Sequence, residues 1–302
     1  MWKCLVPVAL LVAAAPAFAA EQPKVDAAVK KAAEFFKKRV AQGIAGPQNF
    51  VHGNGELSLM GLAMLEAGVP PADPAMKAVI QQIRGDALAQ TQTYPVALAV
   101  LFLDRLGDPA DVPVIQMLGV RLYAGMNANG GWGYSTWEEM NGNELARLQK
   151  ALQDRELIGQ PGEPGPGGKP DAPKPPARAG KLHSEVEKVA TAVGQALRAR
   201  GRSNGGDDNS NTQFGILAVW MARKHGVPTD AALDAIERRF LSTQNATGGW
   251  SYSVGSSTGS PSMTCCGLLG LATAVGRREE RRLKVVAPLA PPKEAVAAKT
   301  GV

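Results

Sequence analysis

The chain has 302 residues, of which 45% are hydrophobic and 20% are charged, and its formal net charge is +6 at pH 7. A chain of this length can bury a sizeable core. Its basic balance does not indicate nucleic-acid binding, because no basic stripe is interleaved with aromatic residues. Residues 277–302 hold seven basic residues against three acidic ones, so much of the charge belongs to a segment that we expect to be solvated or to touch an anionic surface.

The first twenty residues have the pattern of a secretory signal. Lys3 supplies a short positive segment, residues 4–15 are apolar, and residues 17–19 (Ala-Phe-Ala) are typical of a cleavage site. The apolar run is too short to span a membrane, and no later segment is long and apolar enough to do so. We therefore expect residues 1–19 to be a signal peptide and the mature protein to be exported, either periplasmic or secreted.

In chain order, the first predicted helix covers residues 24–40 and is apolar on one face. Residues 56–65 are apolar nearly all round, which predicts a buried helix. Asp73-Pro74 is typical of a helix start, because an aspartate cap is followed by proline in the first turn, and it opens a second one-sided helix. Residues 94–106 are again apolar all round, and residues 112–123 predict the next helix.

The same alternation returns in the second half of the chain. Residues 212–223 and 264–275 predict buried helices, and between them Thr229-Asp230 caps a one-sided helix. Each buried helix has a small residue preceded three positions earlier by a hydroxyl, the pairs being Ser58 and Gly61, Tyr94 and Ala97, Thr212 and Gly215, and Thr264 and Gly267. No window alternates as a strand would. The sequence therefore predicts an all-α fold of stacked helical hairpins in two layers.

A six-residue motif occurs twice. Residues 130–135 (Gly-Gly-Trp-Gly-Tyr-Ser) recur as residues 248–253 (Gly-Gly-Trp-Ser-Tyr-Ser), and the upstream helices keep the same offset of 118 residues, which is typical of a repeat architecture. Two glycines permit a tight turn with positive φ, beneath which tryptophan packs with its N–H on a carbonyl or on Gln244. We expect a structural role for the motif residues Gly131, Trp132, Tyr134, Gln244, Gly249, Trp250 and Tyr252. The first copy has Met126 in place of Gln244 and should be held less firmly.

The composition changes at two places. Residues 159–180 are too rich in proline and glycine to pack, which predicts a disordered insertion. The repeat offset crosses this insertion, which favours one interrupted domain over residues 20–276 rather than two domains with a linker. Residues 277–302 are basic and rich in proline and alanine, and we expect them to be a disordered tail.

The second copy of the motif resembles a known family. Residues 244–250 (Gln-Asn-Ala-Thr-Gly-Gly-Trp) are similar to the Q-x3-G-x-W repeat of squalene–hopene cyclases and related terpenoid cyclases, and Gly-Gly-Trp followed by the helix at 262–268 resembles protein prenyltransferase β subunits. The resemblance covers residues 54–275 without the insertion, and it implies an α/α toroid. The roughly four hairpins fall short of the about six in a closed ring, so the ring is either open or completed by a partner such as a second copy.

The resemblance also suggests chemistry to look for. Terpenoid cyclases of this family protonate their substrate with a D-x-D-D cluster, and the nearest sequence here is Asp207-Asp208-Asn209, with Glu56 as the other acid that could pair with Asp208. The alternative is that Asp208 or Asn209 caps a helix. Prenyltransferases bind zinc, but Met263 stands where their histidine would be, and Cys265 and Cys266 lie in an apolar helix. We expect no metal site and no cofactor.

Polar groups at the starts of the buried helices are expected to surround one mouth of a cavity with apolar walls. The candidate ligand contacts are Tyr94, Thr212, Trp220 and Thr264. We expect a noncatalytic binding or scaffold module that takes an apolar small molecule or a protein partner. The alternative is a terpenoid cyclase or prenyltransferase-like enzyme that acts on an isoprenoid lipid and uses Asp208 as its acid.

Overall fold

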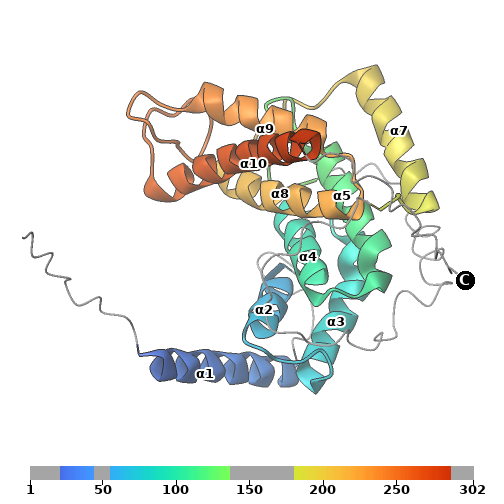
Figure 1. Ribbon diagram of the computed structural model, residues 1–302, viewed down its shortest axis with the longest axis vertical. Coiled ribbons are helices and arrows are strands. Elements are labelled where there is room, and N and C mark those ends of the chain that lie inside the picture. Colours follow the sequence, from blue (N-terminus) through green and yellow to red (C-terminus); the bar gives the residue numbers. More distant parts are fainter. Residues whose placement is uncertain (1–20, 44–54, 137–179, 287–302) are drawn as a thin grey trace, which may run out of the picture.

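The computed structural model describes residues 21–43, 55–136 and 180–286, and within these ranges the chain is helical without any extended strand (Figure 1). The predicted all-α class is therefore confirmed. The expected signal peptide at 1–19 lies outside the described residues. So do the expected insertion, apart from Gly180, and the part of the expected tail that follows residue 286.

The helices lie close to their predicted positions. In chain order they are α1 (Gln22–Ala41), α2 (Gly55–Glu66), α3 (Pro74–Asp86), α4 (Thr93–Leu106), α5 (Val112–Gly125), α7 (Ser184–Arg200), α8 (Asn209–Ala222), α9 (Asp230–Thr243) and α10 (Pro261–Val286). Helix α7 was not predicted. Asp73 caps α3 by accepting a hydrogen bond from Ala75 N at 2.9 Å. Thr229 lies at the N-cap position of α9, but its hydroxyl makes no capping bond.

The predicted boundary of the tail is wrong, because α10 continues to Val286. Arg277 is buried and its guanidinium pairs with Asp234 and Glu237 on α9, and Arg223 pairs with Glu280. Residues 277–286 therefore continue the helix, and at least their first basic residues are fixed by acidic partners. The sequence alone could not place α9 beside them.

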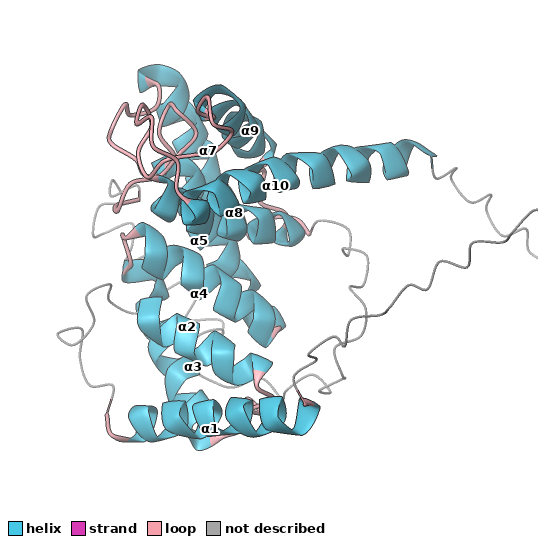
Figure 2. Ribbon diagram, turned by 90° about the vertical axis from the view of Figure 1, so that its left-hand side faces the viewer, coloured by secondary structure: helices cyan, strands magenta, loops and turns pink. Residues whose placement is uncertain are grey.

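Four helices form a row in which each packs against the next, in the order α2, α4, α8 and α10. Helix α3 packs against α2, α5 against α4 and α8, and α9 against α10. Helix α1 lies at one end of the row, and α9 and α10 lie at the other (Figures 1 and 2). Consecutive helices of the row therefore lie side by side.

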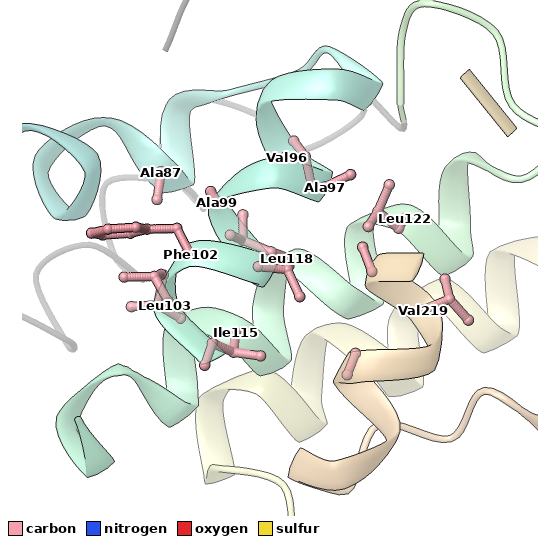
Figure 3. Close-up of a cluster of buried hydrophobic side chains, with 14 of the residues drawn as sticks. Ala87, Val96, Ala97, Ala99, Phe102, Leu103, Ile115, Leu118, Leu122 and Val219 are labelled. Carbon is pink, nitrogen blue, oxygen red and sulfur yellow. The ribbon is translucent and has the colours of Figure 1, made fainter. Parts of the chain in front are cut away.

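The core lies where the row meets the second set of helices. Figure 3 shows Phe102 and Leu103 of α4 together with Ile115 and Leu118 of α5, all of them buried. Helix α2 approaches α4 closely because Gly61 has no side chain: a Cβ there would lie 2.6 Å from the ring of Phe102. A larger residue at position 61 would force the two helices apart.

Two of the helices predicted to be buried all round, α2 and α10, have exposed apolar residues. Leu59 on α2 is 51% exposed, and Leu268 and Val275 on α10 are 57% and 50% exposed. Helix α5 is instead buried along nearly its whole length, because α4, α7 and α8 surround it. Apolar residues on every side of a helix therefore did not by themselves predict complete burial.

None of the helices in the described ranges combines the length and the apolar character that crossing a membrane requires.

Candidate functional site

The two copies of the motif form two similar loops, loop 1 (residues 126–136) after α5 and loop 2 (residues 244–254) after α9. In both, an asparagine side chain closes the turn: Asn127 Oδ1 accepts the N–H of Gly131, and Asn245 Oδ1 that of Gly249, each at 3.0 Å. The first glycine of each pair has a positive φ, 77° at Gly130 and 84° at Gly248. This conformation favours glycine, because the Cβ of any other residue is strained at a positive φ.

Both tryptophans are buried beneath their loops and bonded to the preceding helix. Trp132 Nε1 donates to Leu122 O of α5 at 2.8 Å, and Trp250 Nε1 donates to Phe240 O of α9 at 3.0 Å. The indole N–H therefore finds a backbone carbonyl in each copy. Gln244 is exposed and donates to Gly248 O at 2.8 Å instead.

Each tryptophan also contacts the next helix of the row, at the threonine and the glycine of the repeated sequence pattern. Thr212 Oγ1 accepts the backbone N–H of Trp132 at 3.1 Å, and Thr264 Oγ1 accepts that of Trp250 at 3.3 Å. A Cβ on Gly215 would lie 2.6 Å from the Trp132 ring, and one on Gly267 would meet the Trp250 ring at least as closely. These two threonines hold the loops in place.

Each loop also bonds back to the helix before it in the row. Tyr134 O accepts the N–H of Thr93 at the start of α4, and Tyr252 O accepts that of Asn209 at the start of α8, both at 2.8 Å. Loop 1 therefore joins α4 to α8, and loop 2 joins α8 to α10. The repeated motif cross-links successive helices of the row.

The segment Asp207-Asp208-Asn209 lies between the two loops. Asp208 N donates to Trp132 O of loop 1 at 3.2 Å, and Asn209 Nδ2 donates to Ser251 O of loop 2 at 2.8 Å. The Asp208 carboxylate caps α8: Oδ1 accepts Asn211 N at 2.7 Å and Oδ2 accepts Asn211 Nδ2 at 2.8 Å. Both of its oxygens are occupied by the helix that it begins.

Asp207 is held by a buried arginine, Arg239, which no sequence pattern indicated. Arg239 of α9 pairs with Asp207 and donates to Asn209 Oδ1 at 3.0 Å, and Asn127 Nδ2 also donates to Asp207. Burial opposes ionisation of Asp207, but these hydrogen bonds outweigh it and lower the pKa of its carboxyl group. Arg239 was missed because a charged residue on a one-sided helix is typical of a solvated face.

Glu56, the other candidate acid, begins α2 and is half-buried. Among the described residues no hydrogen bond or ion pair joins it to Asp208 or to any other side chain. The two predicted acids are therefore not linked to each other.

The described starts of α4, α8 and α10 bring several polar side chains together. Tyr94 OH lies 2.6 Å from Ser210 Oγ, Tyr134 OH lies 3.1 Å from Tyr252 OH, and Cys266 Sγ donates to Gln213 Oε1 at 3.0 Å. Burial raises the pKa of Tyr94, and it raises the pKa of Cys266 to about 11. The hydrogen bond with Tyr134 and burial raise the pKa of Tyr252.

Because their pKa values are raised, Tyr94, Tyr252 and Cys266 remain protonated at neutral pH. They can accept and donate hydrogen bonds but are poorly suited to act as bases or nucleophiles.

Helices α8 and α10 each carry accessible apolar side chains, which we together call the apolar face. We use this name for the accessible stripe of α8 (Phe214, Leu217, Trp220 and Met221) with that of α10 (Leu268, Ala272 and Val275). The centres of the Phe214 and Tyr94 rings lie 4.7 Å apart, and Trp220 lies close to Gly276, so side chains of this stripe contact both α4 and α10. Arg223 covers one side of the Trp220 ring at 4.7 Å.

The predicted candidates therefore divide into two groups. Tyr94 and Trp220 lie along this accessible surface, whereas Thr212 and Thr264 hold the tryptophans. The expected looser hold on the first copy is wrong: Met126 is buried, and Arg202 Nη1 donates to Met126 O at 2.9 Å. Asn127 and Asn245 were missed, although their shared offset of 118 residues could have revealed them.

Within the described ranges, no group of three or more histidine, cysteine or acidic side chains is placed to hold a metal ion. Comparison of the chain with protein-family models, with curated proteins and with solved structures gives no match.

Proposed function

We propose that this protein is an exported, noncatalytic binding module of the α/α-toroid type, whose apolar face takes an apolar molecule or the apolar side of a protein partner. The observation that carries this proposal is the exposure of Leu268 and Val275, 57% and 50%, on the same helix that buries Met263, Cys266 and Ala274. Exposed apolar residues grouped on one face are typical of binding surfaces.

The loops support the toroid assignment, because they join successive helices of the row in the same way. A row of hairpins that is linked at each step can close into a ring or present one side as an extended surface. The residues expected to be a signal peptide support export. A ring completed by a second copy remains part of the proposal.

The polar groups at the helix starts would orient the bound molecule. Tyr94, Ser210 and Gln213 supply donors and acceptors at one end of the apolar face, which is the arrangement of many binding sites: apolar walls with a few polar groups at fixed positions. The isoprenoid enzyme gains no support from Asp208, since its carboxylate oxygens both accept hydrogen bonds from Asn211.

The test is native mass spectrometry of the full chain, purified from cells that export it. We expect an apolar molecule or a protein to remain bound, and we expect the double substitution Leu268→Glu with Val275→Glu to remove it. Leu241→Glu is the matched control, because Leu241 is 65% exposed on α9 and lies outside the apolar face. A bare mass for the unsubstituted chain, or binding that survives the double substitution, would contradict the proposal.

A further inference from the structure

A cavity of about 590 Å³ lies between the end of α5, loop 1 and the segment that joins α7 to α8. This volume is within the range of small-molecule sites. Ala124, Met126 and Leu197 are the larger apolar residues among those that line it, and Leu197 is the most accessible of the three. The charged side chains that line it are Arg200 and Arg202, and no acidic side chain of the described residues does so. The cavity is therefore suited to a negative charge attached to an apolar body.

Arg202 is held in place before any ligand arrives. Its guanidinium lies 4.6 Å from the centre of the Tyr123 ring, and Nη1 donates to Tyr123 O at 2.7 Å and to Met126 O at 2.9 Å. The other guanidinium nitrogens, Nε and Nη2, make no hydrogen bond to the described residues. An arginine fixed in this way can bind a carboxylate with little further loss of side-chain entropy.

The walls of the cavity are bonded to each other. Ala128 N donates to Ser203 O at 2.9 Å, and Asn127 Nδ2 donates to Gly205 O at 3.0 Å. A Cβ on Gly133 would lie 2.5 Å from Gly206 O, so this glycine lets the segment approach loop 1. The nearby acid Asp207 is almost fully buried and paired with Arg239, which offsets its repulsion of an anion.

We propose that this cavity binds a small organic carboxylate with an apolar body. The carboxylate accepts hydrogen bonds from the free edge of Arg202, a charge-assisted contact of the strong kind. The hydrocarbon part lies against Leu197. This site does not depend on the apolar face of α8 and α10, so the failure of either proposal leaves the other intact.

The test uses the full chain with decanoate as the probe, decanol as its uncharged counterpart, and isothermal titration calorimetry. We expect saturable binding of decanoate with a dissociation constant below about 1 mM. Decanol should bind the unsubstituted chain at least about tenfold more weakly than decanoate does, and Arg202→Gln should weaken the binding of decanoate by a similar factor. Hydrogen bonds to charged groups contribute on this scale. Arg198→Gln is the control, because it removes the same charge from an exposed position of α7 outside the cavity.

Arg202 also holds the end of α5, so Arg202→Gln could unfold the chain. Ser135→Phe is the second variant: Ser135 is exposed and lines the cavity, and the larger side chain should block binding without disturbing the fold. Equal affinities for decanoate and decanol, an equal loss in Arg198→Gln and Arg202→Gln, unchanged binding in Ser135→Phe, or no decanoate binding at all would overturn the proposal.

Discussion

Loop 1 and loop 2 make the same central contacts but have different surroundings. In both, asparagine closes the turn and tryptophan Nε1 donates to a carbonyl of the preceding helix. A threonine of the next helix accepts the tryptophan backbone N–H, and a glycine of that helix leaves room for the ring. Loop 1 is also bonded to the segment between α7 and α8 through Ala128 and Asn127. The motif thus specifies the local geometry, whereas the neighbouring elements decide which substitutions each position of the motif tolerates.

The largest effect should come from removing the tryptophans. Trp132 and Trp250 are 0% and 1% exposed, so Trp132→Ala and Trp250→Ala should each lower the free energy of unfolding by about 3–5 kcal/mol. Urea unfolding followed by circular dichroism measures this. Trp220→Ala, at a half-buried position, should cost clearly less; a cost for either buried tryptophan that is no larger than for Trp220 would mean that the loops do not hold the row together.

The next prediction separates the two loops at equivalent glycines. Gly248→Ala should lower the free energy of unfolding by about 1–2 kcal/mol through the strain of a positive φ. No further cost is expected there, because a Cβ at this position meets nothing within 4 Å. Gly130→Ala should cost about 1–3 kcal/mol more, because its Cβ would lie 2.5 Å from Ala235 O. Thermal unfolding of both variants provides the measurement, and equal losses would show that α9 can move away from loop 1 easily.

A smaller effect is expected at Asp208, which lies between the loops. Asp208→Ala should lower the free energy of unfolding by about 0.5–2 kcal/mol, since it removes the cap of α8, whereas Asp208→Asn should cost little because asparagine also caps well. The same urea titration measures both variants. If Asp208→Asn were as damaging as Asp208→Ala, the charge rather than the cap would be the important property.

The smallest effect is the pH dependence that Asp207 contributes. Its pKa in the folded protein is below the ordinary value of 3.8, so its stabilisation is present above that value and is lost as the pH falls through the folded pKa. The difference in unfolding free energy between the unsubstituted chain and Asp207→Asn should therefore shrink between pH 7 and pH 3. A difference that stays constant would show that the ion pair with Arg239 does not stabilise the fold.

Part of the candidate site could be predicted from the sequence. The threonines and glycines of α8 and α10 were visible as a repeated pattern, and the tryptophans were expected to be structural. Their partnership was not predicted, because each threonine lies on the helix after the loop that it holds. Arg202 was missed for a similar reason, because its partners Tyr123 and Met126 are distant in the chain.

The sequence by itself determined the local structure of this protein. Helical periodicity, the Asp73 cap and the glycines at the turns depend on near neighbours in the chain, so an all-α fold could be predicted. The tertiary structure decided which surfaces are covered. Helix α5 is buried and α10 keeps an exposed apolar stripe, and Gly133 of loop 1 corresponds to Ser251 of loop 2 because only loop 1 meets Gly206. Burial and clashes of this kind depend on elements that are far apart in the chain and meet only when the helices dock.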